Sequence, residues 1–510
     1  MKVNPIREGR VATMMPEKPY TEADVIVVGY GCAGGAAAIS ACDNGASVII
    51  LEKSAIPTPN SRCSAGNQIY PKDPKDKEKF AAYLHAVSFG TVRREIVDAF
   101  VDGLLQNPDW YKEMGGELEI FLFPPASCSL YIPDKTYSEI PEAQGLELEL
   151  RCLKQTETCP EHVGGDRVWH LLDRQMEKRS IKVMLSTLAK ELVKNERGDI
   201  TGVIAEVEGR DVYIKARKGV IMTCGGFEFD EALKRDNLAP RPIFSFGNPD
   251  NTGDGIRMVQ KAGAALWHMG KQATCLAVKV PEYEAGFVIN LLAPGFIYVD
   301  KYGRRWADET HVECHEFWVP LSYFDTERFE YPRVPTYLIF DEELRRIGPI
   351  SYATMGYNVI TNKYIWSLDN SEEIKKGWII QAKSIPELAK RLSIDESNLA
   401  NTIAKYNEYC EAGKDADFGR PKEMLKAIEG PPYYGMQLWP VLFNTQGGPR
   451  RDKEARVLDP DGKPIPRLYA AGEFGSIWGF LYQTSTNFSE TLVFGRIAGK
   501  NAATSPPLES

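Results

Sequence analysis

The pattern of apolar positions near the N-terminus predicts two strands joined by a buried helix. Residues 24–28 (DVIVV) form a continuous apolar run of the kind found in strands buried on both faces of a parallel sheet. Small and apolar residues continue through 36–41, which indicates a helix that packs closely against that sheet. A second apolar run at 47–51 predicts the next parallel strand. Together these segments form a βαβ unit.

Three glycines connect the first predicted strand to the helix, in the pattern Gly29-x-Gly31-x-x-Gly34. In such a turn the first glycine permits the tight bend, the second lets the backbone approach a pyrophosphate, and the third lets the helix pack on the strand. Glu52 ends the second strand, about 20 residues further on, where an acid can accept hydrogen bonds from ribose hydroxyls. The whole series predicts a dinucleotide site and leaves NAD and FAD undistinguished. A glycine-rich turn without a ligand is the alternative.

The central part of the chain carries further helix and strand patterns, and then its character changes. Helical spacing is found at 76–115 and 168–178, and strands are expected at 181–185, 202–206, 212–215 and 219–222. Asp254 is predicted to cap a helix that runs to residue 262. Between 276 and 435, aromatic residues, prolines and charges mix without the strand–glycine–helix order. We therefore expect a first domain at 1–275, a second domain inserted at 276–435, and a return to the first domain at 436–510.

Composition and charge exclude several classes of protein. The chain has 510 residues, of which 43% are hydrophobic, and a net charge of −9, which disfavours nucleic acid and anionic membranes as partners. No apolar run reaches the ~18 residues of a membrane span, and the N-terminal residues show no signal core, so a cytoplasmic location is expected. The ten cysteines form no CxxC pair. His311 and His315 could share a helix face, but no third ligand is evident, so no metal is expected.

Several motifs in combination resemble the fumarate reductase and 3-ketosteroid dehydrogenase superfamily of flavoproteins. They are LYAAGE (468–473), FGRIAGKNAA (494–503), TGDGIRMVQKAGA (252–264), the TxGG turn at 445–448 and the N-terminal GxGxxG. The resemblance implies an α/β fold, with a Rossmann-like FAD-binding domain and an inserted α+β domain that caps the flavin. It implies non-covalent FAD, because the loop at 61–66 lacks the attachment histidine. The residues that it places around FAD are Gly29, Gly31, Cys32, Ala33, Gly34, Glu52, Lys53, Ser61, Ser64, Ala65, Gly66, Ala189, Gly225, Asp254, Gly472, Glu473 and Ser489.

The chain departs from the fumarate reductases at the positions that hold their dicarboxylate. Asn444 replaces a histidine, Glu313 replaces the arginine of the acid relay, and the segment 479–487 (GFLYQTSTN) contains no arginine. A small dicarboxylate would meet the like charge of Glu313, which disfavours its binding. Fumarate is therefore not the expected substrate.

The ketosteroid dehydrogenase branch matches better in the last loop. Tyr482 falls on that branch's catalytic tyrosine, three residues after Gly479, while Thr486 replaces a glycine whose N–H holds the substrate carbonyl. We expect Tyr482, helped by the Thr486 N–H, to polarise a ketone, and Glu313 to take the α-proton, with His311 and His315 as the next candidates for the base.

Two functions remain open at this stage. The first is desaturation of an uncharged cyclic ketone, steroid-like or smaller, or the reverse reduction of an enone, with an unidentified electron acceptor or donor. The second is reduction of another unsaturated acid, for which a separate haem or iron–sulfur protein would supply electrons, since the chain has no CxxCH haem site.

Overall fold

The computed structural model describes residues 18–122, 137–155 and 162–508. Its first sheet has the order β19-β20-β9-β1-β2-β6, and β7 and β8 extend it as an antiparallel arm from β9. Strands β1, β2, β6, β9 and β20 run parallel. The bounds are β1 Thr21–Val28, β2 Val48–Leu51, β6 Lys182–Met184, β7 Thr187–Lys194, β8 Ile200–Val207, β9 Arg210–Met222, β19 Arg456–Leu458 and β20 Pro464–Ala470.

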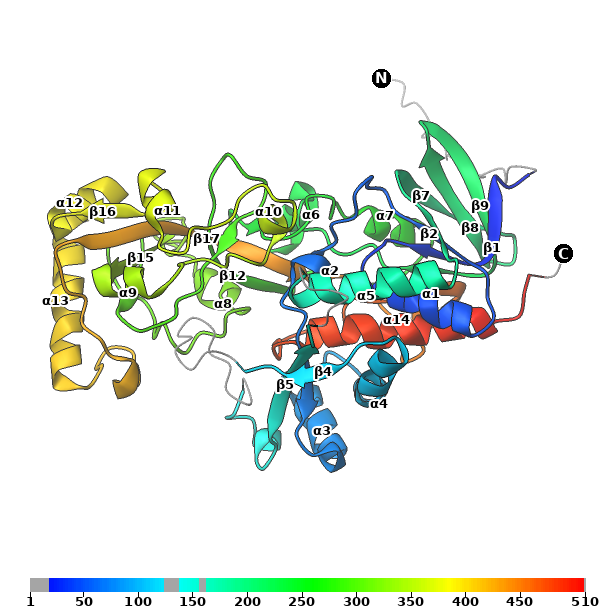
Figure 1. Ribbon diagram of the computed structural model, residues 1–510, viewed down its shortest axis with the longest axis horizontal. Helices are drawn as coiled ribbons and strands as arrows, with labels where there is room; N and C mark the ends of the chain where they lie inside the picture. The colour runs from blue at the N-terminus through cyan, green and yellow to red at the C-terminus, as the bar shows by residue number, and fades with distance from the viewer. Residues whose placement is uncertain (1–17, 123–136, 156–161, 509–510) are drawn as a thin grey trace, which may run out of the picture.

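The first and last long helices of this region lie side by side near the sheet (Figure 1). They are α1 (Cys32–Asp43) and α14 (Thr486–Thr504). Two glycines of the FGRIAG segment permit the close approach: a Cβ at Gly495 would lie 2.7 Å from the Ala33 carbonyl oxygen, and one at Gly499 would lie 2.2 Å from that of Ala37. The C-terminal helix therefore packs closely on the helix of the N-terminal βαβ unit.

Other elements surround this region. Helix α5 (Gly164–Lys178) packs on α1, and α4 (Arg94–Glu113) packs on α14. A small sheet of order β3-β5-β4 lies with α3 and α4 at the bottom of Figure 1. The remaining bounds here are α2 Asn60–Cys63, β3 Gln68–Pro71, α3 Lys77–Val87, β4 Leu118–Ile120, β5 Leu148–Leu153, α6 Glu231–Asn237, α7 Asp254–Lys261, β11 Leu266–Trp267 and β18 Gly448–Pro449, with 3₁₀ turns at Pro74–Asp76 and Pro141–Ala143.

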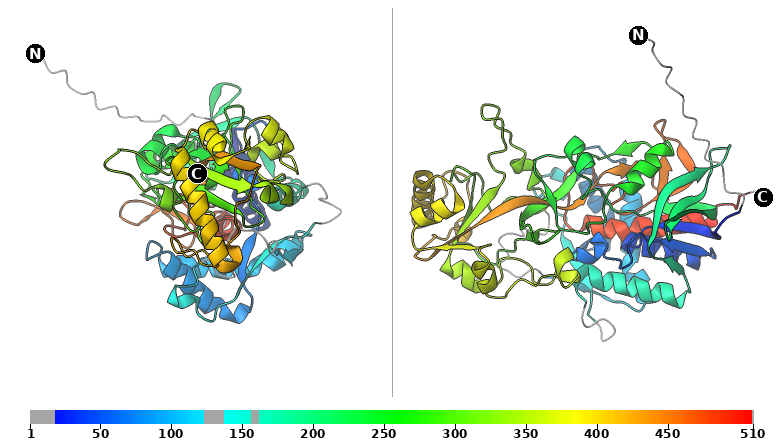
Figure 2. Two further views of the ribbon diagram at one scale, coloured as in Figure 1. Left: turned by 90° about the vertical axis from the view of Figure 1, so that its left-hand side faces the viewer. Right: turned by 90° about the horizontal axis from the view of Figure 1, so that it is seen from above.

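A second large sheet forms the other half of the elongated molecule, on the left of Figure 1 and viewed end-on in Figure 2. Its order is β13-β12-β17-β15-β14, with β10 and β16 also paired to β17. The bounds are β10 Phe244–Ser245, β12 Gln272–Val278, β13 Phe287–Val288, β14 Phe296–Val299, α8 Trp318–Leu321, β15 Thr336–Asp341, α9 Glu342–Ile347, α10 Tyr357–Ile360, α11 Ser371–Lys375, β16 Ile380–Ala382, α12 Ile385–Leu392, α13 Glu396–Ala412, a 3₁₀ turn at Lys422–Met424 and β17 Tyr433–Thr445.

Both predicted limits of the inserted domain fall within strands of this second sheet. Positions 276 and 435 fall inside β12 and β17, so the chain crosses between the two halves along paired strands. Strand β17 is long because it spans the second sheet and ends, at Thr445, beside the first. The division into domains stays a prediction.

The structure corrects several local predictions. Residues 212–222 belong to one strand, β9, and β7 was not predicted. Gly253, with φ of +67°, precedes α7, and Asp254 makes no capping bond; its carboxylate instead accepts from Lys53 Nζ at 2.7 Å. His311 and His315 lie in turns between β14 and α8, so they share no helix face. Asn444 and Thr445 end β17, where a flexible turn was expected.

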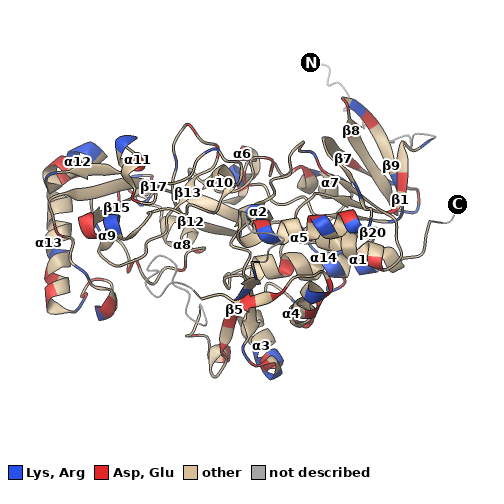
Figure 3. Ribbon diagram, in the orientation of Figure 1, with Lys and Arg blue, Asp and Glu red and all other residues tan. Residues whose placement is uncertain are grey.

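The described surface carries lysine, arginine, aspartate and glutamate interspersed over both halves (Figure 3). No helix within the described residues is both long and apolar enough to cross a membrane.

Candidate active site

A continuous cavity lies between the carboxyl ends of β1, β2 and β9 and the second sheet, and most residues predicted to contact the cofactor line it. Those that line it are Gly29, Gly31, Cys32, Ala33, Glu52, Lys53, Ser61, Ser64, Ala65, Gly66, Ala189, Gly225, Asp254 and Glu473. Gly34, Gly472 and Ser489 are not among the described lining residues and contact residues that are, or their neighbours. Gly34 packs on Gly29, and a Cβ at Gly472 would lie 2.9 Å from Ala33 Cβ. The buried Ser489 hydroxyl donates to the Ser485 carbonyl.

The glycine turn has the geometry that its sequence predicts. Gly29 has φ of +106°, and a Cβ there would lie 2.4 Å from the Thr223 carbonyl oxygen. At Gly34 a Cβ would lie 2.1 Å from the Gly29 carbonyl oxygen, so α1 could not pack this closely with any side chain. The Cys32 N–H, at the start of α1, donates to Ser61 Oγ at 3.1 Å. The helix N-terminus therefore faces the cavity, where its positive dipole end favours phosphate groups.

Glu52 is held at the end of β2 by backbone donors. Its carboxylate accepts from the Tyr30 N–H at 3.0 Å and the Ser54 N–H at 2.9 Å. Burial raises the pKa of this carboxyl, although both backbone donors oppose that shift. The backbone bonds fix Glu52 at the cavity wall, where it can accept from the hydroxyls of a ribose.

Two carboxyl groups meet at the cavity wall. Glu473, which follows β20 and lines the cavity, lies beside Glu228, which is fully buried and follows β9. The Thr445 N–H donates to Glu228 Oε1 at 2.9 Å and to Glu473 Oε1 at 3.1 Å. Burial, followed by the charge of Glu228, raises the pKa of Glu473 well above its usual range. Burial and its neighbour therefore both favour the protonated form of Glu473.

The far end of the cavity is formed by the loop before α14 and the turns before α8. Tyr482 lines it, and burial raises the pKa of this phenol. The backbone amides of Asn487 and Ser485 oppose that rise in the pKa. Because burial raises its pKa, the phenol keeps its proton and can donate it to an acceptor in the cavity.

His315 is a titratable residue that lines the cavity beside Tyr482. Its ring centroid lies 4.7 Å from that of Tyr482, and its Nδ1 lies 2.8 Å from Glu313 Oε1. Glu313 is buried behind it and is not among the described residues lining the cavity. The carboxylate of Glu313 is bonded to His315, which does line the cavity, so the role of Glu313 as the base stays a prediction. His311 is also outside the described lining.

The Thr486 N–H, which we expected to bind the substrate carbonyl, is hydrogen-bonded within the protein instead. Thr486 is the first residue of α14 and is fully buried. Its N–H and its hydroxyl both donate to the Gln483 carbonyl oxygen, the N–H at 3.2 Å and the hydroxyl at 2.5 Å. The Thr486 N–H is therefore engaged in a turn, while its neighbours Ser485 and Asn487 are among the residues that line the cavity.

Glu316 was missed by the sequence analysis. It is 6% exposed; Oε1 accepts from the Tyr482 N–H at 2.8 Å and Oε2 accepts from Trp318 Nε1 at 2.7 Å. Burial and the nearby charge of Glu313 raise the pKa of Glu316 to about 8. In the sequence, the one feature that pointed to Glu316 was its position in the run ECHE (313–316). The sequence analysis also missed Glu228, which is marked only by its position after the glycine turn that follows β9.

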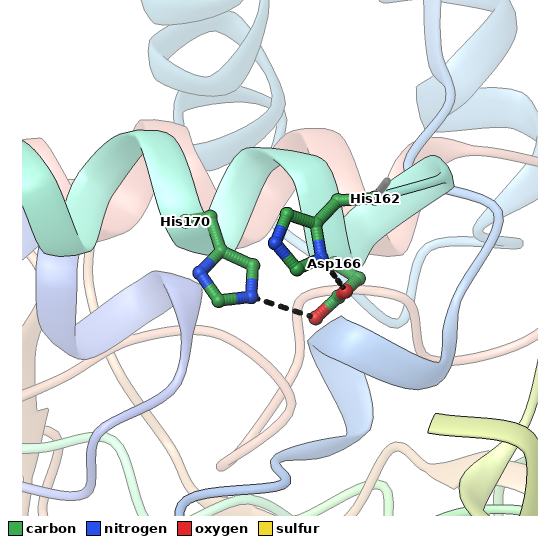
Figure 4. Close-up of side chains that lie close together, drawn as sticks. All are labelled: His162, Asp166 and His170. Carbon is green, nitrogen blue, oxygen red and sulfur yellow. Dashed lines mark hydrogen bonds and ion pairs between the residues drawn. The ribbon is translucent and has the colours of Figure 1, made fainter. Parts of the chain in front are cut away.

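A second group of titratable residues lies outside the cavity, on α5 and just before it (Figure 4). Asp166 Oδ2 is 2.6 Å from His162 Nδ1, and its Oδ1 accepts from Arg62 Nε at 2.6 Å and lies 3.6 Å from His170 Nε2. Both oxygens are thus engaged by cationic or imidazole groups. The cluster ties α5 to α2, which lines the cavity.

The residues present fit FAD. The cavity runs without interruption from Glu52 and the α1 N-terminus, which suit an adenosine diphosphate, past Glu473 to Tyr482. Gly225, with φ of +70°, and Gly66, with φ of +68°, keep the backbone open along its walls. His315 and Tyr482 line the same cavity.

Comparison with known proteins shows that the chain is similar to FAD-binding proteins. The model of the FAD binding domain family matches residues 24–488. The chain is 26% identical to a fumarate reductase (cytochrome) of Shewanella frigidimarina over 95% of its own length and 78% of that protein. It is also 26% identical to a 3-oxosteroid 1-dehydrogenase of Mycobacterium tuberculosis, over 94% of this chain and 98% of the other.

Among solved structures, the 3-ketosteroid Δ1-dehydrogenase of Sterolibacterium denitrificans, in complex with 1,4-androstadiene-3,17-dione, has the same fold. The TM-score is 0.79 at 23% identity, covering 95% of this chain and 99% of that one. Taken with the cavity, these matches show that the chain belongs to the FAD-binding-domain family that includes fumarate reductases and 3-oxosteroid dehydrogenases, and that it is an FAD-dependent oxidoreductase.

Proposed function

We propose that the protein desaturates a C–C bond next to the carbonyl of an uncharged cyclic ketone, or reduces the corresponding enone. The observation that carries this proposal is the contact between Tyr482 and His315, a hydrogen-bond donor and a proton-transfer group whose rings lie 4.7 Å apart on one cavity wall. A carbonyl oxygen and the α-carbon are separated by a single atom. A donor to the one and a base for the other must therefore be neighbours.

In this reaction each residue has one task. The Tyr482 hydroxyl donates to the carbonyl oxygen and stabilises the enolate that develops there. His315, through the ring nitrogen that Glu313 does not hold, takes the α-proton, while the Glu313 carboxylate fixes the ring and balances the imidazolium charge. Bound FAD supplies the two-electron acceptor for the hydride that leaves the β-carbon. In the reverse direction His315 returns the proton.

The absence of a cationic clamp favours an uncharged substrate. Among the described residues lining the cavity, Lys53 is the one Lys or Arg, and it is paired with Asp254 at 2.7 Å. The end near Tyr482 is lined mainly by apolar and aromatic side chains, namely Phe246, Cys314, Tyr352, Met355 and Phe443. Such a wall suits a flat, apolar ring system.

A second candidate is the reduction of an unsaturated acid with electrons from a separate protein. The named activity of the Shewanella relative favours it. In this chain a carboxylate could be held by neutral donors, since Asn444 and Asn487 both line the cavity and their side chains are bonded to each other at 2.9 Å.

Anaerobic spectroscopy of the FAD-loaded protein separates the two. We expect saturated cyclic ketones to bleach oxidised flavin, or cyclic enones to reoxidise flavin that has been reduced beforehand. Fumarate and cinnamate-type acids are the comparators. Reoxidation by an acid, with no response to any ketone or enone, would establish the second candidate and overturn the first.

A further inference from the structure

The carboxyl pair at the cavity wall has a feature that the reaction above does not use. Glu228 and Glu473 are bonded to the same two donors. The Thr445 N–H bonds an oxygen of each, and Asn60 Nδ2 lies 3.4 Å from Glu228 Oε1 and 3.1 Å from Glu473 Oε2. Neither carboxyl forms an ion pair with any Lys, Arg or His of the described residues.

Two buried carboxylates that share the same two donors cannot both be ionised without a compensating cation. The like charges repel, and burial away from water adds a further cost. Among the described residues, the elements around the pair place no Lys or Arg beside it. Helix α2 contributes Asn60 and β17 contributes Thr445. The turn after β9 contributes Gly226, where a Cβ would lie 2.4 Å from a Glu473 oxygen and 2.6 Å from a Glu228 oxygen. The charged groups elsewhere on the cavity wall are Glu52, Lys53, Asp250 and Asp254, and Lys53 is paired with Asp254.

We propose that Glu228 and Glu473 hold a single proton between them, and that Glu228 is a positioning residue that keeps Glu473 protonated at the FAD-binding wall. Glu473 then presents a neutral carboxyl to the cofactor. The proposal goes beyond the ketone chemistry and does not depend on it, because it concerns how the protein binds FAD in either redox direction.

The shared proton links FAD affinity to pH. When the pair loses its proton at high pH, it becomes a dianion beside a ligand that already carries phosphate charge, so binding weakens. If one proton is linked to binding, the FAD dissociation constant rises by up to about tenfold per pH unit above the pKa of the pair.

The test titrates apoprotein with FAD by flavin fluorescence quenching between pH 6 and pH 9.5. We expect the wild-type dissociation constant to rise with pH and that of Glu228→Gln to change much less, because an amide donates to Glu473 without competing for a proton. Glu231→Gln is the matched control, since it lies three residues away with an 82% exposed side chain, and it should follow the wild type. Superimposed curves for wild type and Glu228→Gln would overturn the proposal.

Infrared difference spectroscopy on the holoprotein gives a second readout. Reduction of the bound flavin should perturb a protonated-carboxyl C=O stretch that remains in Glu316→Gln and is missing in Glu228→Gln. A wild-type spectrum at neutral pH without any protonated-carboxyl band, or with a band that Glu228→Gln retains in full, would contradict the shared proton, whatever the substrate proves to be.

Discussion

His315 Nδ1 lies 2.8 Å from Glu313 Oε1, and the second oxygen of Glu313 accepts the backbone N–H of the same histidine at 2.6 Å. One buried carboxylate thus fixes both the ring and the main chain of the residue that reaches the cavity. The sequence analysis named Glu313 as the first candidate for the base, with His315 behind it. On the proposed mechanism, this contact makes His315 the base and Glu313 the group that orients it.

Replacing His315 should slow flavin reduction by the substrate without releasing FAD. We expect His315→Ala to reduce the rate about 10²- to 10⁴-fold, the usual contribution of a positioned acid or base. Added imidazole should restore part of the activity of His315→Ala and none of the loss in Glu313→Ala. Glu313→Gln keeps an oxygen for the Nδ1 bond and should lose less than Glu313→Ala. Equal rates in wild type and His315→Ala would show that the base lies elsewhere.

Glu316 should make stability depend on pH. Burial raises its pKa to about 8 in the folded protein, so the fold holds this proton more tightly than the unfolded chain does. That contribution is complete below the ordinary carboxyl range and is lost as pH rises to about 8; it is on the order of a few kcal/mol.

The measurement for Glu316 is chemical denaturation of Glu316→Gln and wild type at several pH values. The decline in unfolding free energy between pH 5 and pH 8 should be smaller in Glu316→Gln. Glu208→Gln, with an 83% exposed side chain, serves as the control and should match the wild type. Parallel curves for all three proteins would refute a raised Glu316 pKa.

The contact between α1 and α14 should tolerate no methyl group at Gly499. A Cβ there would lie 2.2 Å from a backbone oxygen that cannot rotate away, so Gly499→Ala should destabilise the protein by about 1–3 kcal/mol. Gly35→Ala is the matched change inside α1, because its nearest neighbours are side-chain carbons of Leu172 at 3.3 Å. Thermal unfolding should show the larger loss for Gly499→Ala, and the reverse order would contradict the packing.

The cofactor half of the cavity was predictable because local sequence dictates it. Gly29 and Gly34 are required by backbone contacts within one turn, and Glu52 follows from the length of the βαβ unit. The catalytic end was harder to predict, since Tyr482, His315 and Glu316 come from segments more than 160 residues apart that meet only when β17 spans both halves. Sequence alone could therefore nominate the run at 313–316 but not decide which side chain faces inward.

The central claim is that Tyr482 polarises a substrate carbonyl. The most direct measurement is the single-turnover rate of flavin reduction by a reactive cyclic ketone in Tyr482→Phe, or of reoxidation by the enone. Our account predicts a rate about 10²- to 10³-fold below wild type, with the FAD dissociation constant unchanged. A Tyr482→Phe rate equal to that of the wild type would contradict it.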